Sequence, residues 1–280
     1  MCSINNNFEV TVTSLEKAKL LSEYCSLSNS TCKVHLKIDT GMNRVGTLIS
    51  EAHELINYAI NNQYLVLVGV YSHLASSDSP NHAITKMQIE RFNAIVQHVK
   101  SIDDNIICHL ANSGAVTYHP DAYFDMVRPG ILSYGYYVHE EMAKDLIEVK
   151  PCLSLVSRIV HFKHSPSNEG ISYGHRYKTI NEENIVTIPI GYGDGYRRSL
   201  SNKGQEVIIN GKKYPIVGNI CMDMLMVSLG NDIANTGDDV ILIGSDGIIE
   251  IKIDELTSKL DTIDYEILTG FTDRIERVYI

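Results

Sequence analysis

Short apolar runs alternate with longer helical patterns over residues 8–148, and this alternation constrains the fold more than any other feature of the chain. Strands that alternate with helices form a parallel sheet, because each connection must cross over and return to the same end of the sheet. Short continuous apolar runs also indicate strands that are buried on both faces. The predicted strands are 8–12, 34–38, 64–71, 106–110 and 124–127, and the predicted helices are 14–24, 51–60 and 83–100.

Beyond residue 149 the pattern changes to β segments separated by turn signals. Asn210-Gly211 lies between two of them and predicts a hairpin, because a type I′ turn needs positive φ at both central residues. A helix is predicted at 254–260, with Asp254 as its N-cap. The chain is therefore expected to combine an α/β domain at 1–148 with a mainly β domain at 149–280.

Composition argues against several classes of function. The formal net charge is −10, whereas a nucleic-acid surface needs a dense basic face to displace counterions from phosphates. No apolar run approaches the roughly 20 residues that a membrane span requires, and no signal-peptide pattern opens the chain. The six cysteines, Cys2 among them, lack zinc-ligand or CxxC spacing. We expect reduced thiols and no metal in a cytoplasmic protein.

Polar and reactive side chains follow four of the predicted strands. These stretches are 37–44, 72–73, 109–113 and 128–131. Because the carboxyl ends of parallel strands meet at one edge of a sheet or barrel, the four stretches predict a single site there.

The stretch HLKIDTGMNRVG at 35–46 allows two interpretations. Asp39-Thr40-Gly41 by itself indicates only a turn. Lys37 and Arg44 could converge on one carboxylate or phenolate, since arginine offers a planar fork of donors. The alternative is a surface ion pair.

Two further stretches could hold a phosphate. In MVRPGI, Pro129 fixes a turn in which the amides of Gly130 and Ile131 can point outward together. In CHLANSG, Asn112 and Ser113 offer an amide and a hydroxyl. For Ser113 alone, the N-cap of a following helix is the simpler interpretation.

Three other features have simple structural interpretations when taken singly. His73 follows the most apolar strand, where a neutral core histidine is expected. Tyr173 lies in a glycine-flanked, non-periodic stretch and is expected to be a surface aromatic. The glycines of GYGDG at 191–195 do not have dinucleotide-binding spacing.

Taken together, the motifs resemble those of the alanine racemases, pyridoxal-phosphate enzymes that interconvert L- and D-alanine. The matching strings occur in the family's order: HLKIDTGMNRVG, YSHLASSD, HLANSGA, MVRPGI, ISYGHRY, IPIGYGDGYRR, PIVGNICMDMLMV and IDYEILT. The resemblance implies a (β/α)₈ barrel followed by a C-terminal β domain. It also implies a cytoplasmic homodimer that supplies D-alanine for peptidoglycan.

The resemblance assigns catalytic and substrate-binding roles to individual residues. Tyr173 matches the catalytic tyrosine, which enters the partner subunit's site, and His73 matches the histidine that hydrogen-bonds this tyrosine. Arg44 and Met222 match residues at the substrate carboxylate, and Lys37 matches a lysine that is often carbamylated.

Other residues match the cofactor side of the family's site. Arg128 matches the arginine at the pyridine nitrogen of pyridoxal phosphate. The matching phosphate cradle is Ser113, Gly130, Ile131 and Tyr265, with His109 and Asn112 beside it.

One family motif has no match. The cofactor lysine belongs to a string like V-x-K-A-x-A-Y-G-H-G on the first barrel strand, whereas FEVTV resembles the fourth strand. We therefore expect an incomplete barrel that is unstable or associating by itself. The alternatives are a serine or broad-specificity racemase of the same family, and a non-catalytic fragment.

Overall fold

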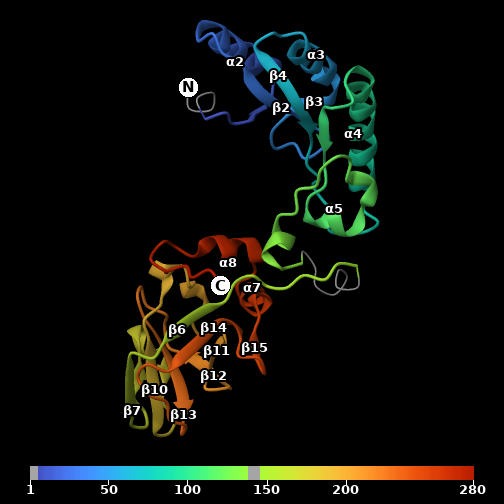
Figure 1. Ribbon diagram of the computed structural model, residues 1–280. Coiled ribbons are helices and arrows are strands. Elements are labelled where there is room, and N and C mark those ends of the chain that lie inside the picture. The colour runs from blue at the N-terminus through green and yellow to red at the C-terminus, as the bar shows by residue number, and fades with distance from the viewer. Residues whose placement is uncertain (1–5, 138–145) are drawn as a thin grey trace. The chain divides into compact units, whose positions relative to one another are not determined.

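The computed structural model describes residues 6–137 and 146–280 of the chain (Figure 1). The chain divides into two compact units, Met1–Lys150 (unit 1) and Pro151–Ile280 (unit 2). Cys2 lies outside the described residues. None of the helices in the described ranges is long and apolar enough to cross a bilayer.

Unit 1 is built on a parallel sheet with the strand order β1-β2-β4-β5, and a short β3 pairs with β2. The strands are β1 (Val10–Val12), β2 (Cys32–Asp39), β3 (Thr47–Leu48), β4 (Leu65–Tyr71) and β5 (Ile107–His109). The helices are α2 (Leu15–Leu27), α3 (Ile49–Ile60), α4 (Ala83–Ile102) and α5 (Ser113–Tyr118), with short 3-10 turns η1 (Pro120–Ala122) and η2 (Ile131–Tyr134). The α/β prediction is thus confirmed, as are the three predicted helices and the first four predicted strands.

The two faces of this sheet differ in chemistry. Val34, Leu36 and Ile38 of β2 belong to the apolar core, which also contains apolar residues of α2, α3 and α4. Because side chains alternate along a strand, His35 and Lys37 lie on the other face. Lys37 is buried on this face too, in agreement with the predicted burial on both faces, although the face is not apolar. The second face of β2 carries polar groups.

The predicted strand at 124–127 does not form. Met126 makes only a single bridge with His109. The carboxylate of Asp125 accepts a hydrogen bond from the Cys108 N–H (2.7 Å) and so takes the place of a backbone carbonyl beside β5. Pro129, which has no N–H, follows soon after. The segment passes along β5 without extending the sheet.

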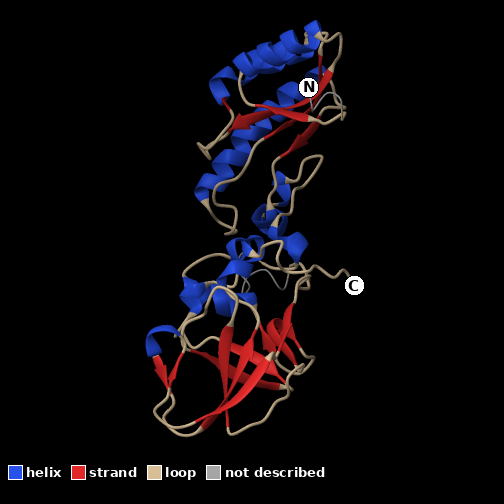
Figure 2. Ribbon diagram, turned by 90° about the vertical axis from the view of Figure 1, so that its left-hand side faces the viewer, coloured by secondary structure: helices blue, strands red, loops and turns tan. Residues whose placement is uncertain are grey.

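Unit 2 is mainly β, as predicted, and its strands pair antiparallel; Figure 2 shows them together. The large sheet has the order β15-β14-β11-β12-β13-β10-β7, with β6 on β14, and β8 pairs with β9. Its strands are β6 (Leu155–Arg158), β7 (His161–Ser165), β8 (Gly170–Ile171), β9 (Tyr177–Lys178), β10 (Glu183–Ile188), β11 (Glu206–Ile209), β12 (Lys212–Val217), β13 (Leu225–Gly230), β14 (Asp239–Ser245) and β15 (Glu250–Ile251).

Local signals in unit 2 are partly confirmed. Asn210 (φ 48°) and Gly211 (φ 76°) both have positive φ and join β11 to β12 in the predicted hairpin. Helix α7 (Ile253–Leu260) has Lys252, not Asp254, as its N-cap. The Glu255 carboxylate accepts a hydrogen bond from the Lys252 N–H (3.2 Å). The helix start is thus capped by the side chain of its third residue and not by that of the N-cap residue.

Three 3-10 turns and one further helix complete the described elements of unit 2. They are η3 (Tyr173–His175), η4 (Tyr192–Asp194), η5 (Arg198–Leu200) and α8 (Asp264–Gly270).

Candidate active site

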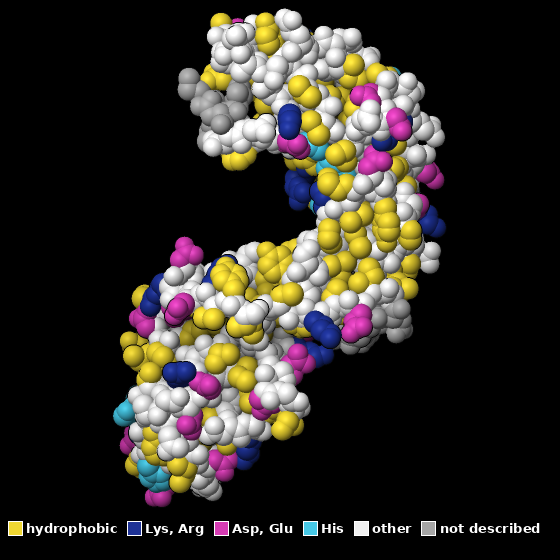
Figure 3. Space-filling model, viewed as in Figure 1, with side chains coloured by type: hydrophobic (Ala, Val, Ile, Leu, Met, Phe, Trp, Pro, Cys, Tyr) yellow, Lys and Arg dark blue, Asp and Glu magenta, His cyan; other side chains and the backbone are white. Residues whose placement is uncertain are grey.

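Four basic side chains come together at the strand ends of unit 1: Lys37, Arg44, His73 and Arg128. Burial lowers the pKa of Lys37, and Arg44 and Arg128 lower it further. Burial, followed by the charges of Arg128, Arg44 and Lys37, lowers the pKa of His73 to about 4. In Figure 3, Lys, Arg and His side chains lie together on one edge of unit 1.

Among the described residues, Asp39 is the acidic group that acts on Lys37, and it opposes the effects of burial and of the two arginines on the Lys37 pKa. Neither Lys37, which is only 9% exposed, nor Arg44 forms an ion pair with any described residue. The alternative of a Lys37–Arg44 surface ion-pair motif therefore finds no acidic partner within the described ranges. A concentration of unpaired positive charge of this kind favours an anionic ligand.

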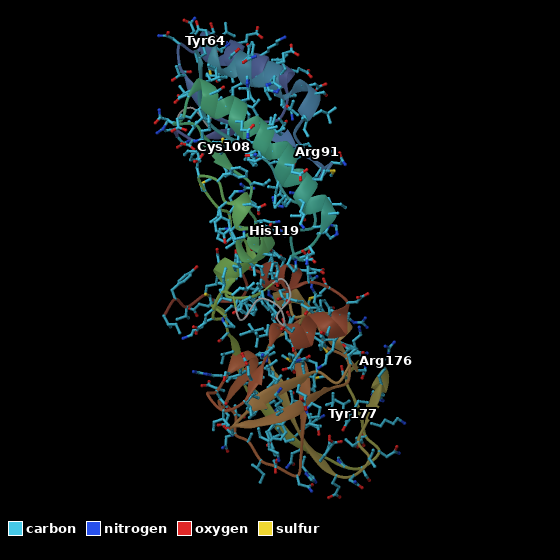
Figure 4. The ribbon with its side chains drawn as sticks, turned by 90° about the vertical axis from the view of Figure 1, so that its right-hand side faces the viewer. Tyr64, Arg91, Cys108, His119, Arg176 and Tyr177 are labelled. Carbon is cyan, nitrogen blue, oxygen red and sulfur yellow. The ribbon has the colours of Figure 1, made fainter. Side chains whose placement is uncertain are left out.

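The loop that carries Arg44 is held in place by its own turn. The Asp39 carboxylate accepts a hydrogen bond from the Gly41 N–H (2.9 Å), which makes it a turn residue, as expected for this triplet. The guanidinium of Arg91, which Figure 4 labels on α4, donates to the Thr40 carbonyl (3.0 Å). Arg44 thus follows a turn that is fixed at Thr40 and Gly41.

Arg128 is the most firmly held of the basic groups. Its Nη2 donates to the carbonyls of Ser72 (2.7 Å) and Leu110 (3.2 Å), and its Nη1 donates to Nδ1 of His109. The guanidinium also lies 5.2 Å from the centroid of the Tyr71 ring. The Nε–H and one Nη1–H have no acceptor among the described residues. Arg128 therefore presents oriented donors that its protein partners do not use.

His109 is a buried, neutral acceptor for Arg128. Its side chain is 4% exposed, and burial, followed by the charges of Arg128 and His35, lowers its pKa to about 3. At neutral pH its Nδ1 lone pair can thus accept from the guanidinium. The sequence indicated a cofactor-side role for His109, and the structure places it behind Arg128.

Ser113 does not cap the following helix, so the N-cap interpretation for it is wrong. The N-cap of α5 is Asn112, whose Oδ1 accepts from the Ala115 N–H (3.2 Å) and from the Ser77 hydroxyl (2.5 Å). Asn112 is well placed for capping because its backbone is extended, whereas Ser113 is already inside the helix.

The Ser113 hydroxyl instead meets the turn at 130–132. It accepts a long hydrogen bond from the Leu132 N–H (3.4 Å), beside the start of η2, where Gly130 is the N-cap. Ser113 as a whole is 1% exposed, and the proton of its hydroxyl has no acceptor among the described residues. A buried donor next to a turn of backbone amides suits a phosphate.

In unit 2, Tyr173 is exposed on a strained loop. Its side chain is 75% exposed, which agrees with a surface aromatic. Ser172 just before it has φ 66° and ψ −177°, a conformation that is rare for a residue with a side chain. The Ser172 hydroxyl donates to the Asn219 carbonyl (2.6 Å), and the Asn219 amide donates to the Tyr173 carbonyl (2.7 Å). The loop thus holds Tyr173 outward.

A pocket of about 700 Å³ adjoins this loop. Its lining includes His161, Lys163, Tyr173, Met222, Met224 and Met226. Met222 is half exposed, so the pocket offers sulfur and apolar surface beside the tyrosine. Tyr265 lies apart from this lining, in the first turn of α8.

The GYGDG stretch supports the loop that carries Met222, a role that the sequence did not reveal. A Cβ on Gly191 would lie 2.2 Å from the Cys221 carbonyl oxygen, so only glycine permits this approach. The Tyr192 and Gly193 N–H groups donate to the carbonyls of Cys221 (3.1 Å) and Met222 (2.9 Å). The available signal was the repeated glycine in GYGDG. Because its spacing does not suit a nucleotide, close packing of backbone against backbone was the remaining explanation.

Comparisons with known proteins agree with both units. A family model described as "Alanine racemase, N-terminal domain" matches residues 1–138, and one described as "Alanine racemase, C-terminal domain" matches residues 152–279. The alanine racemase of Clostridium novyi (strain NT) is 39% identical, and the match covers 99% of this chain and 72% of that protein.

Solved structures give the same result. The alanine racemase of Clostridium difficile 630 superposes with a TM-score of 0.92 at 36% identity, over 100% of this chain and 72% of that one. The alanine racemase of Streptomyces coelicolor A3(2) superposes with a TM-score of 0.91 at 30% identity, over 99% of this chain and 74% of that one. These matches confirm a barrel-type α/β unit followed by a β domain. With sequence matches in both units and a shared fold over nearly its whole length, the chain belongs to the alanine racemase family.

Proposed function

We propose that this chain acts as an alanine racemase, interconverting L- and D-alanine with pyridoxal 5′-phosphate. The observation that carries the proposal is the group of four basic side chains at the strand ends of unit 1, two of which lack acidic partners among the described residues. Both the cofactor and an amino acid bring anionic groups that such a cluster can bind. Membership of a family that uses pyridoxal phosphate supports the same conclusion.

The residues of unit 1 fit this cofactor at two points. Arg128 has oriented N–H groups to spare, and Ser113 has a buried hydroxyl proton without an acceptor among the described residues. The two points lie close along the chain, because Arg128 is followed directly by the 129–132 turn that contacts Ser113. When bound, pyridoxal phosphate supplies an electron-withdrawing ring that acidifies the Cα–H of an attached amino acid.

Arg128 would meet the pyridine nitrogen, and Ser113 with Gly130, Ile131 and Tyr265 would hold the phosphate. Arginine can only donate hydrogen bonds, since its pKa is too high for it to lose a proton. A ring nitrogen beside Arg128 would therefore stay an unprotonated acceptor. Arg128 would in this way weaken electron withdrawal by the ring and favour return of the proton to Cα over side reactions.

Tyr173 would move the proton on one side of the substrate, with His73 as its hydrogen-bond partner. A tyrosine that accepts a proton needs cations nearby, because its reference pKa is about 10. Arg44 and Met222 would line the substrate, with Arg44 at its carboxylate. We propose that Tyr173 serves the site of a second copy of the chain, and its high exposure supports this arrangement.

Racemisation is tested by incubating the purified protein with pyridoxal 5′-phosphate and either L- or D-alanine, and measuring the other enantiomer by chiral chromatography. Reading the gene upstream of the Met1 codon decides which polypeptide to assay, the 280-residue chain or a longer one that contains it. Turnover in both directions, together with solvent deuterium at Cα, is the expected result. Absence of both in the natural polypeptide would favour the non-catalytic alternative.

The amino acid preference is tested in the same assay. We expect a higher kcat/KM for L-alanine than for L-serine, because the motif that contains Tyr265 matches the alanine type, in which a bulky phenol crowds the substrate side chain. A clear preference for serine would assign the chain to the serine or broad-specificity class.

The shared site is tested by mixing two impaired variants. Tyr173→Phe and Arg128→Leu chains are each expected to lose most of the activity when assayed alone. If Tyr173 acts in the partner's site, mixed dimers contain one intact site, and part of the activity returns on mixing. No recovery, despite mixed dimers seen by native mass spectrometry, would contradict a shared site. Homodimerisation and a cytoplasmic location are tested by sedimentation and cell fractionation.

A further inference from the structure

A chain of hydrogen bonds runs behind Arg128 to the first strand of the sheet. Nε2 of His109 lies 3.2 Å from Nδ1 of His35, and Nε2 of His35 lies 2.8 Å from the Glu9 carboxylate. With the Arg128–His109 contact, these groups form a four-member series across β5, β2 and the residue before β1. We name Arg128, His109, His35 and Glu9 the arginine relay.

The chemistry of arginine decides the direction of every proton in this series. Because Arg128 can only donate, Nδ1 of His109 must be the acceptor, and the proton of neutral His109 lies on Nε2. That proton points at Nδ1 of His35, which must then accept it. The His35 proton consequently lies on Nε2 and is donated to Glu9. The geometry thus defines one tautomer for each histidine.

Gly69 makes the relay possible. Strand β4 lies between β2 and β5, and Gly69 is paired with both His35 and Ile107. A Cβ on Gly69 would lie 2.3 Å from Nδ1 of His35 and 2.6 Å from its Cε1. Only a residue without a side chain lets the His35 ring pass over β4 to reach His109.

Tyr71 fixes the plane of the second histidine. Its ring stacks on His109 with the centroids 4.9 Å apart and the planes 4° from parallel. The Tyr71 hydroxyl lies 3.0 Å from Oγ1 of Thr11 on β1. His109 is therefore held by a ring face on one side and by hydrogen bonds in its plane, so that it can accept from Arg128 in one orientation only.

We propose that Glu9 and His35, through the gap at Gly69, are positioning residues that orient His109 and hence Arg128 toward the cofactor's pyridine nitrogen. The series ends in a carboxylate that is 44% exposed and can only accept while ionised. It makes Nδ1 of His109 a stronger acceptor and keeps the free N–H groups of Arg128 directed away from it. This proposal rests on the proposed function for its consequence, but not for its geometry.

The first test reads the tautomers directly, without substrate or cofactor. The 280-residue chain is labelled with ¹⁵N-histidine, and long-range ¹H–¹⁵N spectra are recorded at pH 7.5, with His35→Gln and His109→Gln used for assignment. Both histidines are expected to be neutral with the proton on Nε2. A proton on Nδ1 of His109, or a doubly protonated His35, would overturn the relay.

The second test asks whether the effect of Glu9 travels through His35. Glu9→Gln is expected to shift the ¹⁵N signals of His109, which Glu9 does not touch, and to have no such effect in a His35→Ala background. An equal shift in that background would indicate a through-space field and contradict the relay. Glu182→Gln is the matched control, because Glu182 pairs with His164 (3.4 Å) in unit 2 and should move only the His164 signals.

The third test measures the consequence at the cofactor. Pyridoxal 5′-phosphate binding is followed by equilibrium dialysis, and Glu9→Gln is expected to raise its Kd about tenfold, as for other residues that orient a ligand's direct partners. Glu182→Gln should leave the Kd unchanged. An unchanged Kd in Glu9→Gln would overturn the positioning role. If the proposed function itself is wrong, the tautomers remain as assigned but no racemisation occurs, so the two failures are distinguishable.

Discussion

In unit 1 the side chain of His109 is buried and that of Arg128 is half-buried, and the two are hydrogen-bonded to each other, whereas in unit 2 the side chain of Tyr173 is exposed and its loop is held by contacts to the backbone. Buried groups that are fixed on several sides keep one orientation and one protonation state. An exposed tyrosine costs little to replace and can reach a ligand or a partner. The comparison shows two ways of holding a candidate site residue, by side-chain hydrogen bonds in unit 1 and by backbone contacts of an exposed loop in unit 2.

Tyr173→Phe is expected to have the largest effect, and on catalysis, not on folding. We expect racemisation to fall about 10²–10⁴-fold, the usual contribution of a positioned acid or base, and unequally in the two directions. Because the side chain is mostly exposed, Tm should not change. Initial rates from each enantiomer and a thermal melt measure both effects. Tyr279→Phe, at another exposed tyrosine, is the control, and wild-type rates in Tyr173→Phe would remove Tyr173 from the site.

Gly69→Ala should destabilise unit 1, because the added methyl group has no room between β2 and β5. Its Cβ would lie 2.3 Å from His35 Nδ1 and 2.8 Å from the Ile107 carbonyl oxygen. Overpacking of this kind costs about 2 kcal/mol, roughly a thirtyfold change in the folding equilibrium. Urea unfolding measures the loss.

A double-mutant cycle separates the two contacts of the added methyl group. In a His35→Ala background the cost should fall, but it should not vanish, because the Ile107 contact remains. The same cost in both backgrounds would show that His35 does not occupy the gap over Gly69.

A further prediction is that Lys37 forms a carbamate, which would place a negative charge within the basic cluster. Since its pKa is lowered, some amine is neutral and can add CO₂ with loss of a proton, giving a carbamate whose negative charge can hold Arg44. With ¹³C-bicarbonate, a carbamate ¹³C signal should appear and be absent in Lys37→Gln. We expect the KM for alanine to rise about tenfold in that variant, as for loss of a charge-assisted contact. A spectrum without the signal would mean that Lys37 acts as a cation.

The stability of the two units should depend on pH in different ways. The folded-state pKa is depressed to about 3 for His109 and to about 4 for His73, below the ordinary 6.5. The unfolded chain therefore binds more protons as the pH falls below about 6.5, and unit 1 loses stability from there down to about pH 4 through His73 and to about pH 3 through His109. Between pH 7 and pH 5 the loss is at most about 2 kcal/mol per histidine, since one pKa unit corresponds to about 1.4 kcal/mol.

Hydrogen exchange at pH 7 and pH 5 measures this difference in each unit. His164 in unit 2 has a raised pKa, caused by hydrogen bonds to Asn184 and Glu182, and so acts in the opposite sense. His109→Gln should flatten the profile of unit 1 and leave that of unit 2 unchanged. Equal losses in both units would contradict the assignment of the effect to the buried histidines.

Several parts of the fold followed from local pattern, and the exceptions have physical causes. The Asn210-Gly211 hairpin was predictable because its two residues favour positive φ by themselves. The strand at 124–127 was not, because the Asp125 side chain, and not a backbone ladder, satisfies the Cys108 N–H. Likewise, the N-cap of α5 is Asn112 and not Ser113. The N-cap is the last residue with an extended backbone before the helix, and the sequence does not show which of two neighbouring polar residues that is.

The candidate site was predictable as a set of residues but not as a set of contacts. Motifs in the sequence singled out Lys37, Arg44 and Arg128, which lie together in unit 1. They did not reveal His35 or Gly69, although strand alternation already places His35 on the same face as Lys37. A second polar residue at that spacing on a predicted strand was the available signal.

The sequence by itself determined the family, the order of strands and helices in unit 1, and the chemistry available at the strand ends, because these depend on spacing and residue type along the chain. Only the tertiary structure decided that a histidine on β2 meets one on β5 across a glycine on β4. Such contacts depend on strand register and on the absence of one side chain. His35 and His109 are 74 positions apart in the chain, and the pairing of the strands brings their ring nitrogens to 3.2 Å. No local stretch of the sequence contains that information.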